Sequence, residues 1–175
     1  TLATGIVYDG TAIRYVFTGW SGDASGTGLT SDAITMDAPK TATADWKTQY
    51  QVSFTQSGSG VAPTVDYEAN TDPTDTVPFN VWVKAGSSIS YEYQSPVSGG
   101  TGIQYVLIDT SPTSPQTVNE PLTITGTYKT QYQVTFTQSG LDGTATGTVV
   151  TIDSSAVTYG GLPITDWYDS GTTYS

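Results

Sequence analysis

The chain has 175 residues, of which 16 are acidic and 5 are basic, so its formal net charge is −11. A surface of this sign repels phosphate backbones and anionic lipid headgroups, so nucleic acid and membrane insertion are not expected. The sequence contains no Cys and no His, which excludes disulfides, Cys/His zinc sites and catalytic pairs of a nucleophile with His. It has no run of about 18 apolar residues and no signal peptide. If the protein is exported, we expect a mature chain or an excised piece.

The composition favours strands over helices. Thr makes up about a fifth of the chain, Tyr, Val, Ile and Trp are well represented, and Lys, Glu, Leu and Arg are scarce. No window of a dozen residues has apolar residues at helical spacing. The sequence therefore predicts an all-β protein.

Near the N-terminus, apolar and polar residues alternate over 13–18, which predicts a strand that ends at Gly19-Trp20. A Gly-rich polar loop follows to Gly28. A short apolar alternation then surrounds Ile34 and Met36.

One long alternation follows. The apolar residues at even positions form a single series: Ala42, Ala44, Trp46, Tyr50, Val52 and Phe54. No Gly, Pro or flexible polar run separates Trp46 from Tyr50. The pattern predicts one uninterrupted strand, which is stiffer than a Gly/Ser linker. Residues 128–132 have the same character.

The middle of the chain shows further short alternations separated by turn signals. They predict strands at 49–56, around 65–67, and at 78–84, 88–93, 103–108 and 118–128. Between the second and third of these, residues 70–75 form an acidic loop rich in turn residues.

The sequence repeats itself. Residues 47–58 return at 129–140, an offset of 82, and only Ser53/Thr135 differs. Three further pairs of segments match: 36–46 with 118–128 at offset 82, 13–16 with 103–106 at offset 90, and 78–86 with 163–171 at offset 85. We therefore predict the late half of a β-domain at 1–47, a complete β-domain at 48–129 and the early half of another at 130–175.

The two halves match without a gap, because Ser175 corresponds to Ser90 and Thr1 to Tyr91. Together they amount to one complete domain. Three explanations fit: one period of a longer repeat protein, a subunit whose halves complete each other head to tail, or pairing of the halves within one chain. An isolated half-sheet exposes edge groups and apolar surface, so we do not expect it to persist alone.

Two segments carry a family resemblance. Tyr15-Val16-Phe17-Thr18-Gly19-Trp20-Ser21-Gly22-Asp23 and, further on, Ile34 to Trp46 resemble the divergent internalin B-repeat family of the Listeria–Bacteroides type. The middle repeat departs from that pattern, since Asp109-Thr110 replaces Gly19-Trp20 and Leu122 replaces Lys40. The resemblance implies extracellular modules of large surface proteins, some with a β-grasp fold. Because no helical window exists, tandem immunoglobulin-like sandwiches are expected, with a β-grasp as the alternative.

Acidic residues offer weak candidates for metal binding and catalysis. A calcium site could draw on Asp66, Glu68, Asp72 and Asp75, of which the C-terminal repeat keeps only Asp153, or on Asp23 and Asp32 beside the Gly-rich loop. Paired carboxylates for glycoside hydrolysis could come from Asp66/Glu68 or Asp166/Asp169. For the calcium candidate at 66–75 a solvated acidic loop is favoured, and repeated modules seldom carry one unique active site, so no catalytic, cofactor or metal residue is assigned.

The Gly-rich loop at 19–28 lacks the spacing of a phosphate-binding loop. A carbohydrate-stacking surface could involve six tyrosines: Tyr8, Tyr91, Tyr93, Tyr159, Tyr168 and Tyr174. A Lys–Asn or Lys–Asp cross-link could involve Lys47 or Lys129. All the asparagines (Asn70, Asn80 and Asn119) lie in the middle repeat, so a domain built from the two halves would need an Asp.

The expected function is structural. We expect a repeat or subunit of an extracellular filament, stalk or surface layer, assembled head to tail with copies of itself or adjacent repeats. The alternative is an adhesive module that binds a glycan or protein at the cell surface. No enzymatic activity and no cofactor are expected.

Overall fold

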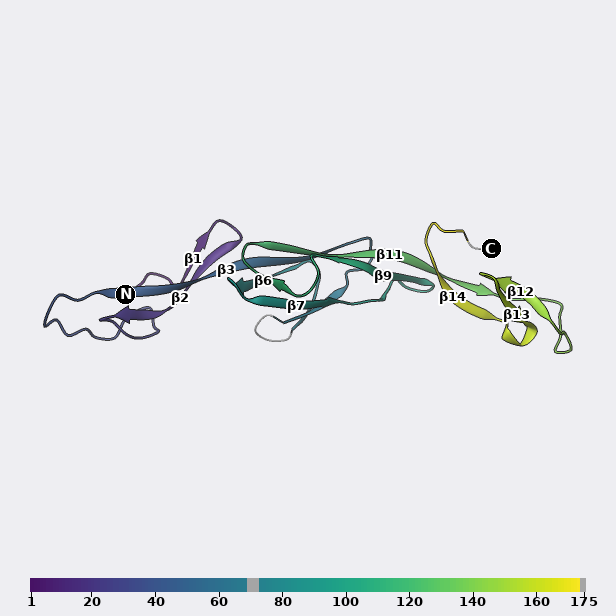
Figure 1. Cartoon of the computed structure of the whole chain (residues 1–175), viewed down its shortest axis with the longest axis horizontal. Helices are drawn as coiled ribbons and strands as arrows, with labels where there is room; N and C mark the ends of the chain where they lie inside the picture. The colour runs from purple at the N-terminus through teal and green to yellow at the C-terminus, as the bar shows by residue number, and fades with distance from the viewer. Residues whose placement is uncertain (69–72, 174–175) are drawn as a thin grey trace. The chain divides into compact units, whose positions relative to one another are not determined.

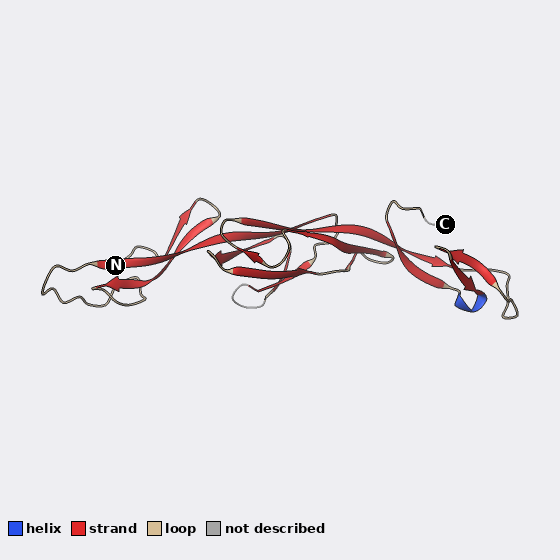
Figure 2. Ribbon diagram, viewed as in Figure 1, coloured by secondary structure: helices blue, strands red, loops and turns tan. Residues whose placement is uncertain are grey.

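A computed structural model describes residues 1–68 and 73–173 of the chain as two compact units. The first unit contains residues 1–55, 64–92 and 110–125, and the second contains 56–63, 93–109 and the chain from 126 onward. Strands build both units (Figures 1 and 2). Over the described ranges the only helical element is one 3-10 turn, η1 (Tyr159–Gly161). No helix in this part of the chain is long and apolar enough to cross a membrane.

In the first unit, the main sheet is antiparallel and centres on one long strand. Its strands are β1 (Ile6–Asp9), β2 (Ile13–Gly22), β3 (Ala42–Ser57) and β6 (Phe79–Lys84). β1 pairs with β2, β2 pairs with β3 over 42–50, and β6 pairs with β3 over 49–54. β3 therefore takes partners from both sides in the sequence, with β2 before it and β6 after it, and it also neighbours β11 (Leu122–Phe136) in the strand order.

A second sheet of the first unit has the strand order β10–β7–β4–β5. These strands are β4 (Thr64–Glu68), β5 (Thr74–Thr76), β7 (Ser88–Tyr93) and β10 (Gln116–Thr117). The Phe54 ring of β3 stacks on Phe79 at 4.7 Å between centroids and contacts Tyr67 and Tyr91 at 5.5 and 5.7 Å. This aromatic group joins the two sheets, and aromatic burial of this kind dominates the stability of small cores.

The core of the first unit follows the alternation that the sequence predicts. Its fully buried side chains come from strands that alternate inward and outward residues, and from the segment before β11: Val52, Phe54, Val65, Ile89, Val118 and Ile124. Each buried Val, Ile or Phe side chain contributes about 1.5–3 kcal/mol relative to exposure.

The second unit contains β8 (Val97–Ser98), most of β9 (Ile103–Ser111), the part of β11 (Leu122–Phe136) from residue 126 onward, β12 (Thr148–Ile152), β13 (Ser155–Thr158) and β14 (Ile164–Asp169). β9 lies between β8 and β11, and β14 pairs with β11 over 131–136. β12 and β13 form a separate hairpin whose turn holds Asp153 and Ser154 at positive φ. β11 thus resembles β3 in having an earlier strand on one edge and a later strand on the other.

The structure confirms the all-β class and both uninterrupted strands. β3 runs through Trp46–Tyr50 without a break, and β11 runs likewise through 128–132. The tandem immunoglobulin-like sandwich, the β-grasp alternative and the domain limits at 47 and 129 stay predictions.

Two local expectations are wrong. β2 continues past Gly19-Trp20 to Gly22, because a bulge between Phe17 and Gly19 absorbs the Gly. Residues 34–36, where the sequence shows a short apolar alternation, form no strand, and Met36 is 74% exposed. The closing strand begins at Leu122 rather than at 118, since residues 118–121 form its approach.

Alkaline pH should destabilise the fold. Burial raises the pKa of Tyr67, Tyr91 and Tyr128 to about 12, and for Tyr67 a hydrogen bond to Asp75 adds to the effect. The unfolded chain loses these protons near pH 10 while the folded chain keeps them. Stability is therefore fully present below pH 10 and falls as pH rises toward 12.

Melting temperatures measured from pH 8 to 12 test this expectation. Tyr91→Phe should melt slightly lower at pH 8, because the hydroxyl donates a hydrogen bond to the Pro112 carbonyl oxygen. It should lose less stability than the parent chain between pH 10 and 12. Equal alkaline slopes in the two proteins would contradict the assignment.

Candidate assembly interface

The repeated motif occupies two different environments. Val52 and Phe54, on β3, are 0% exposed. Their counterparts at offset 82 are Val134 and Phe136, on β11, and Val134 is 37% exposed while Phe136 is only half-buried. The local sequence is the same, so the difference comes from what packs against it. The C-terminal copy of the motif presents a core face to solvent.

The last residues of the motif also lie in different environments in its two copies. Residues 55–57 belong to β3, and the Thr55 hydroxyl lies 2.9 Å from the Thr125 hydroxyl and donates to the Ile124 carbonyl oxygen at 3.3 Å. The identical Thr-Gln-Ser at 137–139 follows the end of β11 and is not in a strand. A strand extends where a neighbour supplies ladder partners, so this edge of the C-terminal segment lacks the neighbour that the first copy has.

Two glycines sharpen the comparison. Gly58 has φ +84°, and a Cβ built on it would lie 2.1 Å from the Tyr128 carbonyl oxygen. Gly140, its counterpart, keeps φ +90°, but a Cβ there would meet no atom within 4 Å. The left-handed conformation explains a glycine at both sites. Only Gly58 also needs it for the close approach of another backbone.

The turn after the motif is already formed in both copies. In the first copy, the Gln56 side chain accepts from the Ser59 amide at 3.0 Å and donates to the Ser59 carbonyl oxygen at 3.1 Å. In the second, the Gln138 side chain makes the same two bonds with Leu141, at 3.1 and 3.5 Å. A partner binding here would meet a preorganised edge, which reduces the entropic cost of association.

An open apolar groove of about 380 Å³ lies beside the exposed motif, in the second unit. Its lining consists of the outward residues of β11 with the end of β14 and the turn after it: Tyr132, Val134, Phe136, Tyr168, Asp169, Ser170, Gly171 and Thr172. Tyr132 is 48% exposed. The counterparts of Val134 and Tyr168 are Val52 and Val83, which are 0% and 4% exposed. The groove is therefore the open counterpart of a filled core.

The first unit carries complementary features near the N-terminus. Met36 is 74% exposed, whereas its counterpart Val118 is 1% exposed, and Ala42 is exposed where Ile124 is fully buried. The end of this segment is fixed to the Gly-rich loop, because Lys40 lies 3.6 Å from Asp23 and the Thr41 amide donates to Asp23 at 2.8 Å. Positions that are buried in one copy of the repeat and exposed in the other make this segment a candidate contact surface.

Each long strand is held by side-chain contacts across its two pairings. In the first unit, the Arg14 guanidinium donates to Gln49 at 2.7 Å and lies 4.5 Å from the centroid of the Trp82 ring. These residues come from β2, β3 and β6, so the contacts join the strand before β3 to the strand after it. A cation over an aromatic face adds roughly 0.5–1 kcal/mol at exposed sites.

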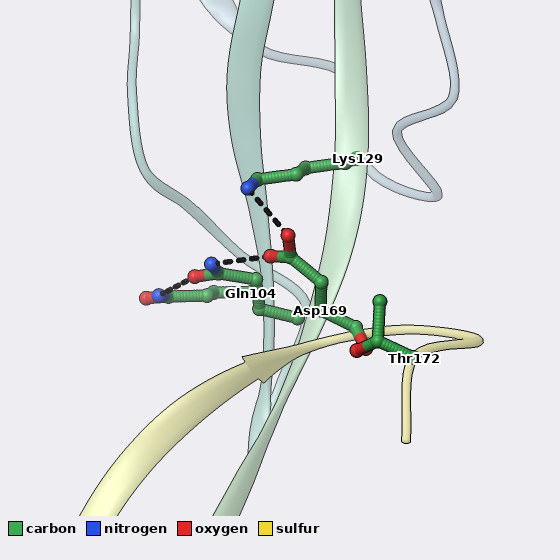
Figure 3. Close-up of polar contacts among 5 residues, drawn as sticks. Gln104, Lys129, Asp169 and Thr172 are labelled. Carbon is green, nitrogen blue, oxygen red and sulfur yellow. Dashed lines mark hydrogen bonds and ion pairs between the residues drawn. The ribbon is translucent and has the colours of Figure 1, made fainter. Parts of the chain in front are cut away.

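In the second unit, a polar chain occupies the equivalent place (Figure 3). Gln104 donates to Gln131 at 2.8 Å, and Gln131 donates to Asp169 at 2.8 Å. Lys129 forms an ion pair with the other Asp169 oxygen at 2.8 Å. Hydrogen bonds from Lys129 and Gln131 lower the pKa of Asp169 below its ordinary value. In both units, side-chain contacts thus link the long strand to the strands on either side of it, although the chemistry of the contacts differs.

The calcium candidates do not converge in the described residues. Asp66 accepts from Thr74, and Asp75 accepts from Tyr67 at 2.7 Å. Asp72 lies outside the described residues. Across residues 1–68 and 73–173 no three Asp or Glu side chains form a group able to hold a metal.

The acidic residues near the Gly-rich loop are structural. Asp23 accepts from the Thr41 amide at 2.8 Å and faces Lys40 at 3.6 Å. Asp32 accepts from the Ser25 hydroxyl at 2.7 Å. These bonds fix the loop at 19–28 onto the start of β3. Asp153 takes the first position of the β12–β13 turn, where its positive φ suits a short polar side chain.

The carboxylate pairs have unequal geometry. Asp66 and Glu68 are two residues apart on β4 and share its outer face, where they line a groove of about 210 Å³ with Glu92. Asp166 and Asp169 are three residues apart on β14, so they point to opposite faces. The structure therefore does not bring Asp166 and Asp169 together as a catalytic pair.

The six tyrosines divide by burial. Tyr91 and Tyr93 are 7% and 2% exposed, so assigning them to a sugar surface is wrong. Tyr159 and Tyr168 are half-buried in the second unit, and Tyr174 lies outside the described residues. Tyr8 is 58% exposed and packs edge-on against Trp82 at 5.9 Å.

The lysines of the cross-link idea have different surroundings. Lys47 is exposed and lies opposite Val16 on β2. Of the asparagines, Asn80 lies on β6, Asn119 is exposed, and Asn70 is outside the described residues. Lys129 contacts Asp169, as the composite domain would require. The lowered pKa of Asp169 keeps its carboxylate ionised, which favours an ion pair over condensation to an amide.

No protein-family model, no curated protein and no solved structure matches the chain. The resemblance to the internalin B-repeat family therefore stays a prediction. The internal repeat is therefore the reference for comparison, because residues of the two terminal segments have counterparts in the middle of the chain.

The matched valines give a direct test of the two environments. Val52→Ala should lower the free energy of unfolding by about 2–3 kcal/mol, because it removes buried methyl groups and leaves a cavity. Val134→Ala should change it by less than about 0.5 kcal/mol in the dilute chain, because that side chain is already partly exposed. Urea unfolding of both variants measures the difference. Equal losses would show that Val134 is buried in solution.

The polar chain at β11 makes a second prediction. Lys129→Gln should raise the pKa of Asp169 toward its ordinary value, since it removes the largest contribution to the lowered pKa. Carboxyl chemical shifts followed by NMR from pH 2 to 6 measure it. Lys47→Gln, at the equivalent position of β3, is the control and should leave the Asp169 titration unchanged. An unaltered Asp169 pKa in Lys129→Gln would disprove the ion pair.

Proposed function

We propose that the protein is a structural repeat or subunit of an extracellular filament, stalk or surface layer, assembled head to tail with copies of itself or adjacent repeats. The observation that supports this most is the motif at 129–140, which leaves a core face exposed where its twin at 47–58 is buried. A face that is a core in one copy and open in another is suited to completion by a neighbour.

The long strands support a structural role further. β3 and β11 each hydrogen-bond to an earlier strand and a later one, and each strand runs without a break through the residues where the sequence repeats meet. The acidic surface, with a net charge of −11, suits a polymer that must stay soluble outside the cell. No catalytic residue set enters this proposal.

An adhesive module remains the second candidate, and one observation favours it. The exposed Tyr8 ring packs against Trp82, whose face also carries the Arg14 guanidinium. Aromatic rings with a nearby donor can stack on sugars and bind their hydroxyls. A glycan array that detects binding by the parent chain and none by Tyr8→Ala would support this candidate over a purely structural role.

Self-association tests the structural proposal. Sedimentation and light scattering from about 1 to 500 μM should show a mass that rises with concentration, and electron microscopy should show linear particles. High salt should weaken assembly little, because the exposed face is apolar. A monomer at every concentration would contradict the proposal. Labelling of intact source cells with an antibody tests the extracellular location.

A further inference from the structure

Val118 shows how the groove is filled where it is complete. In the first unit, the Gly86 amide donates to the Val118 carbonyl oxygen at 2.8 Å, and the Val118 amide donates to the Ser87 carbonyl oxygen at 2.9 Å. The side chain of Val118 is 1% exposed. Just before it, β10 pairs antiparallel with β7, with Thr117 opposite Ser88. The segment is fixed by its backbone as well as by its side chain.

The second unit repeats the receiving half of this arrangement. Gly171 is the counterpart of Gly86 and has φ +81° against +76°. Thr172 is the counterpart of Ser87, and both Gly171 and Thr172 line the open groove. The turn that receives Val118 in the first unit is thus present in the second, next to an apolar surface of Val134, Phe136 and Tyr168.

The filling half is repeated as well, at the other end of the sequence. The counterpart of Val118 is Met36, which is 74% exposed. Thr35 corresponds to Thr117, and Thr43 to Thr125, whose hydroxyl contacts Thr55 at 2.9 Å. The counterpart of Tyr128, whose carbonyl oxygen closely faces Gly58, is Trp46.

From these correspondences we propose that the groove at Val134, Tyr168 and Gly171 binds the Met36 segment of a second copy of this chain. The proposal rests on the head-to-tail assembly proposed above and names its contact. Met36 enters the groove, and its backbone bonds to Gly171 and Thr172. The segment 42–46 of the second copy then runs along 136–140, as 124–128 runs along 54–58, with Thr43 beside Thr137 and its Trp46 carbonyl oxygen against Gly140.

The chemistry of the groove fits this occupant. Met is unbranched and flexible, so it fills an irregular apolar groove that Val would fill incompletely. The one carboxylate in the lining, Asp169, is already engaged by Lys129 and Gln131, so an apolar side chain strands no unpaired charge there. A small exposed Gly at 140 leaves room for a backbone to approach.

Cysteine pairing tests the register of this contact. Directly opposed residues of an antiparallel ladder lie about 4.5–5.5 Å apart, within the range of a disulfide. The chain has no Cys, so only introduced residues can react. A Thr35→Cys chain and a Thr173→Cys chain of different tagged mass, mixed at a concentration where the parent associates and then oxidised, should give the mixed dimer as the main product.

Two controls fix the meaning of that result. Thr117→Cys with Ser88→Cys in one chain places the pair where the structure has direct partners, and it should close within the chain. Thr35→Cys mixed with Thr151→Cys, which is exposed on β12 away from the groove, should give at least tenfold less mixed dimer. Equal yields from the Thr173 and Thr151 mixtures would overturn the proposal.

Gly140→Ala provides a second test that does not depend on oxidation. The φ of +90° strains an Ala at this position, but a Cβ there meets no atom, so the dilute chain should stay folded. Self-association should weaken at least tenfold, because the Cβ blocks the Trp46 carbonyl oxygen. Gly58→Ala, with nearly the same φ, should instead destabilise the fold. Undiminished association of Gly140→Ala would overturn this contact. Association without cross-linking or a Gly140 effect leaves the proposed function standing, whereas absence of any association refutes both.

Discussion

The structure depends on one constraint: a single strand that keeps both of its edges hydrogen-bonded to different parts of the sequence. β3 gives residues 42–50 to β2 and 49–54 to β6, so the two ladders overlap at Gln49 and Tyr50. Bending the strand at that overlap would break bonds on both sides. The side chains respect the same constraint, since Arg14 bonds to Gln49 and also covers Trp82. A long continuous strand therefore replaces a linker.

The same constraint explains the open face in the second unit. β11 keeps its ladder with β14 up to Phe136, and the sequence beyond it repeats that of β3 without forming a strand. Gly140 and Gln138 retain the backbone turn of their counterparts. Local sequence thus suffices for the turn, whereas burial of Val134 requires a neighbour. Because local sequence forms the turn but burial needs a neighbour, the face that contains Val134 can be preformed and still exposed to solvent.

Much of the strand pattern was predictable, because a period of two over 42–54 leaves little choice of structure. The groove was not, since it arises where β14 joins β11, and pairing over such separation is invisible to local patterns. Met36 illustrates the limit: its alternation with Ile34 does not say whether the side chain is buried, and the structure leaves it 74% exposed. The sequence repeat pairs Met36 with Val118, and comparing their burial shows that Met36 is exposed where its counterpart is buried. Tyr91 and Tyr93 likewise needed packing information.

The double pairing of β3 also determines how the protein would respond to tension. A pull along an antiparallel strand loads its ladder bonds together, in shear, instead of opening them one at a time from an end. Because β2 and β6 grip successive parts of β3, a pull transmitted through β3 must shear one of the two ladders before the strand can slide. Two such bonds flank the overlap, where the Gln51 amide donates to the Ala12 carbonyl oxygen and the Ala85 amide donates to the Thr48 carbonyl oxygen. On β11 the equivalent bonds run from the Gln133 amide to Gly102 and from the Ser170 amide to Thr130. Each long strand is thus built as a mechanical clamp.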